Sequence, residues 1–327
     1  MALLDLSAAF DTVDHDILLD RLRVSFGISG AALSWFHSYI SGRRQSVRCG
    51  GASSSLVDVV CGVPQGSVLG PILFVLYTVD LLSVDSAFGL SVHLYADDSQ
   101  IYGSCHPCDT SALSSSLSSC SSAVADWMRS NRLQLNADKT DVMWFASARR
   151  ASSLPSSPVT IAGSDVLPAS AIHNLGVLVD SDLGAASHVR LVVSRCFAAL
   201  RQLRQLRRYV SDDCFRSLVV ALVHSRLDYG NFILVGSPAY RLHCVQSVLN
   251  AAARLTLRLG RFDHVTDALA TLHWLRVPER VDFKLAVQSY RVLHGMAPEY
   301  MNVLLTSPVG VIYVRPLPVG LKFRPTN

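Results

Sequence analysis

Short apolar runs broken by glycine, proline and polar residues alternate with stretches of helical spacing over the first 183 positions. This pattern predicts a mixed domain of strands and helices. We expect strands where the apolar runs are short, namely up to Asp5 and at 45–49, 56–60, 90–94, 100–103, 142–146, 159–162 and 172–179. We expect helices where apolar residues recur every three or four positions, namely from Asp14 to Gly27, at 31–40, at 68–82 and from 111 to 128.

Two of these expected helices require a choice. The serine-rich stretch 111–123 could be a flexible linker, but Leu113 and Leu117 lie four positions apart and favour an amphipathic helix. The stretch 68–82 is mostly apolar, and Pro71 is tolerated in the first turn of a helix. We therefore expect a helix there that is buried on most sides.

The periodicity becomes helical after Leu183, with expected helices at 186–208, 211–227, 243–260 and 279–294. This change predicts an α+β domain over residues 1–183 and a helical domain over 184–260. The remaining residues, 261–327, are expected to form a C-terminal helical segment with an irregular tail from Ser307 onward.

The composition favours a folded protein without a membrane span. Half of the 327 residues are hydrophobic, which allows a substantial core. The longest apolar run, 68–77, has ten residues, whereas a membrane span needs about 20. Because Met1 runs directly into a segment with Asp5 and Asp11, we expect no secretory signal, an intracellular location in the nucleus or cytoplasm, and reduced cysteines. The lone C-x-x-C at 105–108 has no partner pair at zinc-site spacing and predicts a loop.

The charge is distributed unevenly along the chain. Residues 1–183 carry 10 Lys+Arg and 17 Asp, a net charge of −7, whereas residues 184–327 carry 19 Lys+Arg and 8 Asp+Glu, a net charge of +11. An acidic half joined to a basic half fits a metal site followed by a surface for a polyanion. Nearly all of the basic residues are arginine, whose planar fork donates two parallel hydrogen bonds to phosphate.

Three of these arginines are expected to lie on one helix face. Arg201, Arg204 and Arg208 are spaced at i, i+3 and i+7, and Arg195 and Arg207 flank them. Such a stripe is either a solvated face or a contact for the backbone of a nucleic acid.

Three carboxylates are candidates for a metal site. Asp97 and Asp98 lie between two apolar runs, at the expected turn of a β-hairpin, and Asp5 ends a strand. Adjacent carboxylates repel one another, so a fold retains them either in an exposed loop or where a cation neutralises them. Two Mg²⁺ ions about 4 Å apart can activate a hydroxyl and stabilise a leaving pyrophosphate. The glycine-containing loop 62–67 could let its backbone approach a nucleotide closely.

Five segments, in this order and spacing, resemble the palm motifs of reverse transcriptases, and the match is closest to the type encoded by non-LTR (LINE-like) retrotransposons. They are 2–15, 62–74, 95–98, 131–145 and 174–176. Further segments resemble the thumb and downstream region of those enzymes. They are 224–230, 250–254, 272–275 and 294–298, so the resemblance covers about residues 1–305.

The resemblance implies an RNA-directed DNA polymerase with a right-hand palm, built of an antiparallel sheet with helices, followed by a helical thumb. It implies that Asp5, Asp97 and Asp98 hold two Mg²⁺ ions, with Mn²⁺ as an alternative. The implied partners are an RNA template, a DNA primer and deoxynucleoside triphosphates.

Other positions receive roles from the same resemblance. Phe10 would be a steric gate against the ribose 2′-hydroxyl, with a core phenylalanine as the alternative. Gln65 and Gly66 would line the nucleotide and template pocket, with an ordinary turn as the alternative. Lys139 would sit near the triphosphate and protonate the departing pyrophosphate, with a solvated surface lysine as the alternative. The segment 174–176 would lie in the hairpin that grips the primer.

The chain departs from the family pattern at its start. The fingers region, which precedes the strand of the first catalytic aspartate in this family, has no counterpart before Asp5, and neither has the usual upstream endonuclease domain. We therefore expect a truncated reverse transcriptase with impaired polymerisation. One alternative is a non-catalytic, nucleic-acid-binding remnant of such an element. A metal-dependent nuclease is a further alternative, but it would leave the pocket at Gln65 and Gly66 without a purpose.

Overall fold

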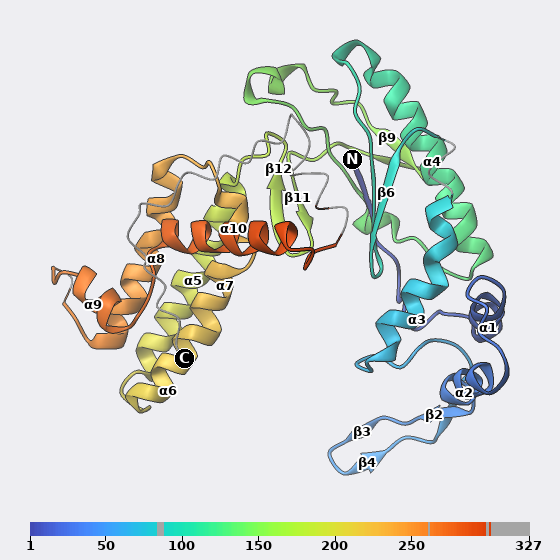
Figure 1. Ribbon diagram of the computed structural model, residues 1–327, viewed down its shortest axis with the longest axis horizontal. Coiled ribbons are helices and arrows are strands. Elements are labelled where there is room, and N and C mark those ends of the chain that lie inside the picture. Colours follow the sequence, from blue (N-terminus) through green and yellow to red (C-terminus); the bar gives the residue numbers. More distant parts are fainter. Residues whose placement is uncertain (84–87, 261, 299–300, 302–327) are drawn as a thin grey trace. The chain divides into compact units, whose positions relative to one another are not determined.

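The computed structural model describes residues 1–83, 88–260, 262–298 and 301, and the chain divides into two compact units, Met1–Leu183 and Gly184–Asn327 (Figure 1). The first unit mixes strands and helices and the second is helical. The predicted α+β class is therefore confirmed. Among the described helices, none combines the length and the apolar character that crossing a membrane requires. No disulfide links the described cysteines.

A four-stranded antiparallel sheet is the centre of the first unit. Its strands lie in the order β6 (Ser91–Tyr95), β7 (Asp98–Tyr102), β1 (Ala2–Leu4) and β8 (Asp141–Val142). In this register Leu3 faces Gln100 on one side and Asp141 on the other. The strand predicted at 142–146 is shorter than expected, because the ladder ends at Val142, although the Met143 N–H still donates to the Met1 carbonyl over 2.9 Å.

Four helices pack with this sheet around one core. They are α1 (His15–Val24), α2 (Gly30–Ile40), α3 (Leu69–Thr78) and α4 (Thr110–Ser130). The Asp14 side chain caps α1, the helix predicted to begin at Asp14, by accepting hydrogen bonds from the N–H groups of Asp16 and Ile17. The serine-rich stretch forms α4 with Leu117, Val124 and Met128 buried, so the linker alternative is wrong.

The prediction that the apolar helix at 68–82 is buried on most sides is wrong. Helix α3 buries Leu73, Phe74 and Tyr77, and a 3₁₀ turn over Val79–Ser83 follows it. Val68 and Val75, by contrast, are 85% and 55% exposed. The helix is apolar on both faces, but the sheet and the other helices cover only one of them.

Hairpins extend the first unit beyond the central sheet. The pairs are β2 (Arg43–Gln45) with β5 (Val57–Val59), β3 (Arg48–Cys49) with β4 (Ala52–Ser53), β9 (Val159–Ile161) with β10 (Ser164–Val166), and β11 (Ala171–Asn174) with β12 (Val177–Asp180). The single run predicted at 172–179 is thus two strands that turn at Leu175 and Gly176. The C-x-x-C segment leads into a 3₁₀ turn, Pro107–Asp109. Short 3₁₀ turns also occupy Ala137–Lys139 and Ala148–Ser153.

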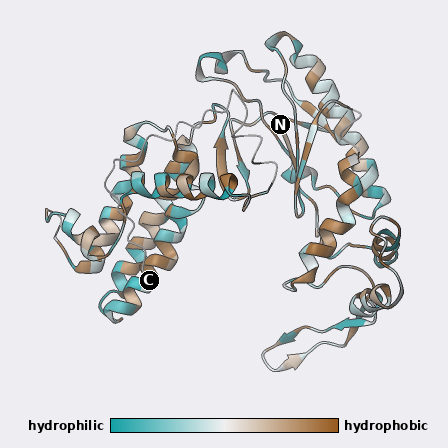
Figure 2. Cartoon of the chain, in the orientation of Figure 1, coloured by the Kyte–Doolittle hydropathy of each residue, from teal (hydrophilic) through white to brown (hydrophobic). Residues whose placement is uncertain are grey.

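The second unit is a set of helices around its own core. The helices are α5 (Ala186–Leu206), α6 (Asp212–Val219), α7 (Ser225–Asp228), α8 (Ala239–Leu257), α9 (Thr266–Thr271) and α10 (Val277–Leu293). A π-helical turn, Val220–His224, joins α6 to α7, and a 3₁₀ turn covers Asn231–Leu234. Figure 2 shows hydrophobic and hydrophilic residues alternating along these helices, and the buried set includes Leu203, Phe215 and Leu249. The tail predicted from Ser307 lies outside the described residues.

Candidate active site

The pairing of β1 with β7 brings two carboxylates to the same end of the central sheet. Leu4 lies opposite Ser99, so Asp5 and Asp98 are the next residues on the two antiparallel chains. Tyr95 lies opposite Asp98 in the β6–β7 hairpin, which leaves Ala96 and Asp97 as its two-residue turn. The predicted hairpin is therefore confirmed, but only Asp97 lies in its turn, because Asp98 is the first residue of β7.

The turn holds a residue in a costly backbone conformation. Ala96 has a φ of 54°, in the left-handed region that costs a residue with a Cβ roughly 1 kcal/mol or more. Backbone strain of this kind persists only where the surrounding pairing imposes it, and it gathers at functional sites.

The three carboxylates interact electrostatically. Partial burial raises the pKa of Asp98, the charges of Asp97 and Asp5 raise it further, and the Lys139 charge lowers it. Asp98 is thus held where its ionised form is repelled by two neighbours of the same sign. A cation among these groups would relieve the repulsion.

Lys139 supplies one positive charge to this cluster. Its Nζ lies 3.0 Å from Asp5 Oδ2, with the lysine side chain 67% exposed and the aspartate side chain 23% exposed. The Asn136 N–H also donates to the Asp5 carbonyl over 2.9 Å, which ties the segment before Lys139 to the end of β1. Lys139 is therefore not a free surface lysine, because its ammonium group is paired with the Asp5 carboxylate.

An open pocket of about 380 Å³ adjoins these residues. Its walls come from β1, β7, the segment 138–141 and the β11–β12 turn, and include Asp5, Asp98, Asp138, Lys139, Asp141, His173, Asn174 and Leu175. The Gln100 side-chain amide donates to Asn174 Oδ1 over 2.8 Å, which fastens the β11–β12 hairpin to β7. Asp138 and Asp141 were not predicted as site residues from the sequence, although they flank Lys139 and line this pocket.

The residues predicted to line the nucleotide pocket form a second group, tied to the loop that follows β1. The backbone of Gly62 and Val63 bonds to Val13 and Phe10, with N···O distances of 2.7 and 2.8 Å. Gln65 Nε2 donates to Asp11 Oδ1 over 3.0 Å.

Phe10 belongs to this second group as well. It is partly buried, and its ring lies 4.8 Å from that of Phe74 between centroids. Phe10, Gln65 and Gly66 do not line the 380 Å³ pocket, whereas Asp5, Asp98 and Lys139 do.

The donor set suits a hard divalent cation. Carboxylate oxygens are the protein ligands that Mg²⁺ prefers, and Asp5, Asp97 and Asp98 are the residues that would hold it. Over the described part of the chain, however, no three His, Cys, Asp or Glu side chains are already spaced to enclose a metal ion. The Lys139–Asp5 ion pair occupies one of the oxygens concerned.

The predicted arginine stripe is partly wrong. Arg201 and Arg204 are exposed on α5, but the helix ends at Leu206, so Arg208 is exposed beyond its last turn. Arg207 does not flank an exposed face, because it is only 8% exposed and its Nη2 donates to Asp212 Oδ1 over 2.7 Å.

Comparison with known proteins places most of the first unit in one family. The sequence model described as "Reverse transcriptase (RNA-dependent DNA polymerase)" matches residues 1–179. Two relatives from Drosophila melanogaster are the probable RNA-directed DNA polymerases of transposon BS and of the X-element. They are 29% identical over 227 residues and 33% identical over 195 residues, which cover 68% and 59% of this chain but only 24% and 20% of theirs.

A third relative is the RNA-directed DNA polymerase from mobile element jockey of Drosophila funebris, 32% identical over 57% of this chain and 20% of its own length. The chain thus spans about a quarter or less of the length of these relatives. Telomerase from Candida albicans, in complex with a fragment of telomeric RNA, aligns over 84% of this chain and 51% of its own with 13% identity and a TM-score of 0.42, a likeness too distant to bear on the argument.

The mobile-element relatives confirm the resemblance to the LINE-like type found in the sequence. The family match spans the central sheet, the acidic hairpin turn and the β11–β12 turn. The chain therefore belongs to the reverse transcriptase family, the RNA-dependent DNA polymerases.

Proposed function

We propose that this chain performs RNA-directed DNA synthesis, adding deoxynucleotides to a DNA primer along an RNA template. Residues 1–183 are its palm, 184–260 its thumb and 261–327 a further C-terminal segment. The observation that carries the proposal is the convergence of Asp5, Asp97 and Asp98 at one end of an antiparallel sheet, where burial and then the charges of Asp97 and Asp5 raise the pKa of Asp98.

The carboxylates are the metal-holding groups in this proposal. Asp5, Asp97 and Asp98 bind two Mg²⁺, or Mn²⁺ in their place, which when bound activate the primer hydroxyl and neutralise the leaving pyrophosphate. Lys139 has an exposed side chain beside Asp5, within reach of a triphosphate in the same pocket. There it holds a proton that the departing pyrophosphate can take.

The second group of residues selects the nucleotide. Phe10, packed on Phe74, excludes a ribose 2′-hydroxyl, since a ring fixed by a neighbour cannot swing aside. Gln65 and Gly66 line the nucleotide and template pocket, and the Gln65–Asp11 hydrogen bond fixes the loop that carries them to the segment of Phe10. The hairpin turn at 174–176 contacts the primer.

The exposed arginines of the second unit bind the nucleic-acid backbone in this proposal. Arg201, Arg204 and Arg208 are exposed, and a group of exposed guanidinium groups suits phosphate contacts that do not depend on base sequence.

A non-catalytic, nucleic-acid-binding remnant is the second candidate, and one observation favours it. Among the described residues no carboxylate group is already arranged to enclose a metal ion, and Lys139 neutralises Asp5 instead. Such a chain would keep the fold and the basic surface but not the chemistry.

Primer extension separates the two candidates. The purified chain, a DNA primer on an RNA template, deoxynucleotides and Mg²⁺ should give extension that Asp97→Asn lowers at least about a hundredfold, or roughly 3 kcal/mol in the barrier. Asp126→Asn is the matched control, because Asp126 is an exposed aspartate on α4 paired only with Arg129 in its own helix turn. Duplex binding without any extension would establish the remnant, and cleavage of the template would indicate a nuclease.

A further inference from the structure

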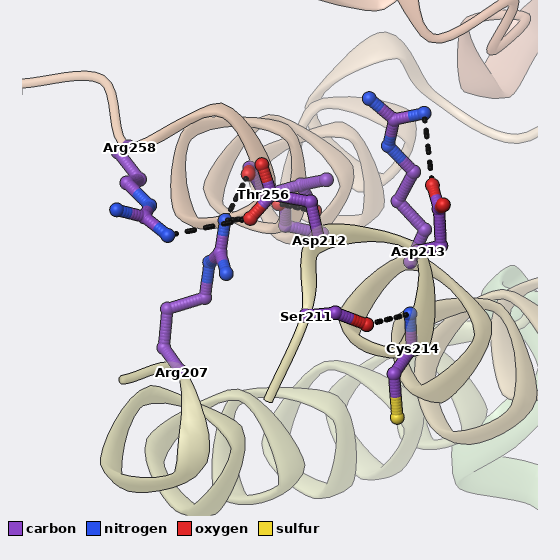
Figure 3. A network of polar contacts seen from close by, with 9 residues as sticks. Arg207, Ser211, Asp212, Asp213, Cys214, Thr256 and Arg258 are labelled. Carbon is purple, nitrogen blue, oxygen red and sulfur yellow. Dashed lines mark hydrogen bonds and ion pairs between the residues drawn. The ribbon is translucent and has the colours of Figure 1, made fainter. Parts of the chain in front are cut away.

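Four arginines line one open pocket in the second unit, where the ends of α5 and α8 meet. The pocket has a volume of about 440 Å³ and is lined by Arg204, Gln205, Arg207, Arg208 and Arg258. Arg204 belongs to α5, Arg207 and Arg208 follow its last residue, and Arg258 follows the last residue of α8. Figure 3 shows Arg207 and Arg258 approaching Asp212 and Thr256 from different segments of the chain.

Arg207 is a buried cation with unused hydrogen-bonding capacity. Its Nη2 donates to Asp212 Oδ1 over 2.7 Å and to the Thr256 carbonyl over 3.1 Å, and its guanidinium carbon lies 4.6 Å from the centre of the Phe215 ring. Its Nε and Nη1 are buried and have no hydrogen-bond partner among the described residues. Buried donors without partners are costly and uncommon, and a bound ion is one of the few reasons for a fold to keep them.

The charge around this pocket is not balanced by its one contacting carboxylate. Asp212 Oδ1 is shared, since Arg258 Nη2 also lies 3.3 Å from it. The pKa of Asp212 is lowered, first by the hydrogen bond from Arg207, so the carboxylate is charged and still offsets only one of four cations. For Arg204, neither an ion pair nor a side-chain hydrogen bond occurs within the described part of the chain.

Helix capping explains only half of this cluster. Arginines near helix C-termini can bond the last carbonyls, and Arg207 does so to Thr256 of α8. That role accounts for Arg207 and, as the residue ending α8 with a φ of 57°, for Arg258. It does not account for Arg204 or for Arg208, whose guanidinium carbon lies 4.7 Å from the centre of the Tyr209 ring and which belongs to the same pocket.

We propose that this pocket binds one phosphodiester group of a nucleic-acid strand. Arg204, Arg208 and Arg258 offer forked donors at the rim, and the buried charge of Arg207 adds attraction that water screens weakly. The nucleic-acid source of the phosphate rests on the proposed function, whereas the excess of positive charge does not. The site therefore fixes one phosphate of the backbone at a defined position on the second unit.

A backbone scan tests this anchor. An RNA/DNA duplex carrying a single neutral methylphosphonate at successive positions is titrated against the full chain without nucleotides or Mg²⁺. One position should weaken binding about tenfold, as expected for loss of a charge-assisted contact. In the double variant Arg204→Gln, Arg258→Gln, a methylphosphonate at that position should no longer weaken binding. The double variant Arg190→Gln, Arg216→Gln removes the same charge from exposed residues outside the pocket and should keep the position sensitive.

The Asp212→Asn variant should bind the duplex more tightly, an effect opposite to that of the arginine variants, and a misfolded variant would not show it. Removing the one contacting carboxylate should tighten duplex binding several-fold and steepen its dependence on salt. Equal small losses at every methylphosphonate position, or equal losses in both double variants, would overturn the proposal. If inorganic phosphate competed with the duplex but no methylphosphonate position weakened binding, the assignment of the bound phosphate to a nucleic-acid backbone would be overturned. Because no nucleotide is added, failure of polymerisation would leave these outcomes unaffected.

Discussion

The carboxylate of Asp98 shows how one residue can lower the stability of the fold. Its pKa is raised by burial and by the charges of Asp97 and Asp5, so its contribution to stability is present below the ordinary value of 3.8 and is lost as pH rises through the raised pKa. At neutral pH the ionised group therefore opposes folding in the absence of a cation.

Asp98→Asn should consequently raise the free energy of unfolding at pH 7 without metal, by less than about 1 kcal/mol, because the residue is only partly buried and water screens its charge. The gain should vanish below pH 3.8, where Asp98 is protonated. Urea denaturation with and without Mg²⁺ is the measurement, and Mg²⁺ should stabilise the parent more than the variant. A variant less stable than the parent at pH 7 would show that the repulsion is already relieved by Lys139.

Position 62 requires glycine for two reasons, its left-handed backbone conformation and the close approach of the Asp11 backbone. Its φ is 81°, and a Cβ there would lie 2.8 Å from the Asp11 carbonyl oxygen and 2.9 Å from the Asp11 Cα. Both are backbone atoms, so neither can rotate away.

Gly62→Ala should thus lower the free energy of unfolding by roughly 2–5 kcal/mol, the sum of a left-handed penalty and a steric clash. Gly66→Ala is the matched control in the same loop, because its φ is 76° but no atom lies within 4 Å of the added Cβ. It should lose only about 1–2 kcal/mol. Equal losses of unfolding free energy in denaturation experiments on the two variants would mean that the Asp11 backbone moves away from the added Cβ at little cost.

At the scale of elements, the predictions from the sequence succeeded where the local hydrophobic pattern agrees with the strand pairing and helix packing of the structure. The hairpin that carries Asp97, the helix that begins after Asp14 and the serine-rich helix are each specified by a short stretch of sequence and are all present. Helix α9 was missed, since its six residues carry too few apolar positions to define a period. The exposed face of α3 could not be foreseen, because apolar residues surround that helix and only tertiary packing decides which of them are covered.

Arg207 marks a different limit of sequence-based reasoning. Its spacing is that of a solvent-exposed stripe, yet it is buried because Asp212, Thr256 and Phe215, none of them neighbours on α5, provide its partners. The meeting of Asp5, Asp97 and Asp98 at one end of the sheet was predictable from the sequence. The pairing of Lys139 with Asp5 was not, because it depends on where the chain returns after α4.

The hydrogen bond between Gln100 and Asn174 couples two elements of the site, the strand β7 and the β11–β12 hairpin. Gln100→Ala and Asn174→Ala should each lower the free energy of unfolding by about 1–3 kcal/mol, because each leaves a partly buried amide unpaired. A double-mutant cycle should give a coupling of about 1 kcal/mol. Thr160→Ala, in the β9–β10 hairpin, is the control partner and should be additive with Gln100→Ala. Additivity of Gln100→Ala with Asn174→Ala would show that the hairpin is held by other contacts.

At the scale of the whole molecule, the two units should respond to acid in opposite ways. In the first, the Asp98 contribution to stability is lost as pH rises. In the second, burial and then the charge of Arg280 lower the pKa of His224 from 6.5 to about 4. The folded second unit therefore resists protonation of His224, and its stability falls as pH drops from 6.5 toward 4.

Acidification from pH 7 to pH 5 should lower the free energy of unfolding of the second unit by about 2 kcal/mol, since unfolded histidine takes up a proton that the folded one refuses. His224 is 5% exposed, its Nδ1 lies 3.1 Å from Arg280 Nη2, and its ring lies 4.1 Å from that of Trp274, so protonation would place two cations in contact inside the core. Hydrogen exchange of the full chain, corrected for the intrinsic effect of pH, would report each unit separately. His224→Asn should abolish the acid sensitivity of residues 184–298, and the exposed His243→Asn should retain it. Equal acid sensitivity in the His224→Asn variant and the parent would assign the effect to another group of the helical unit.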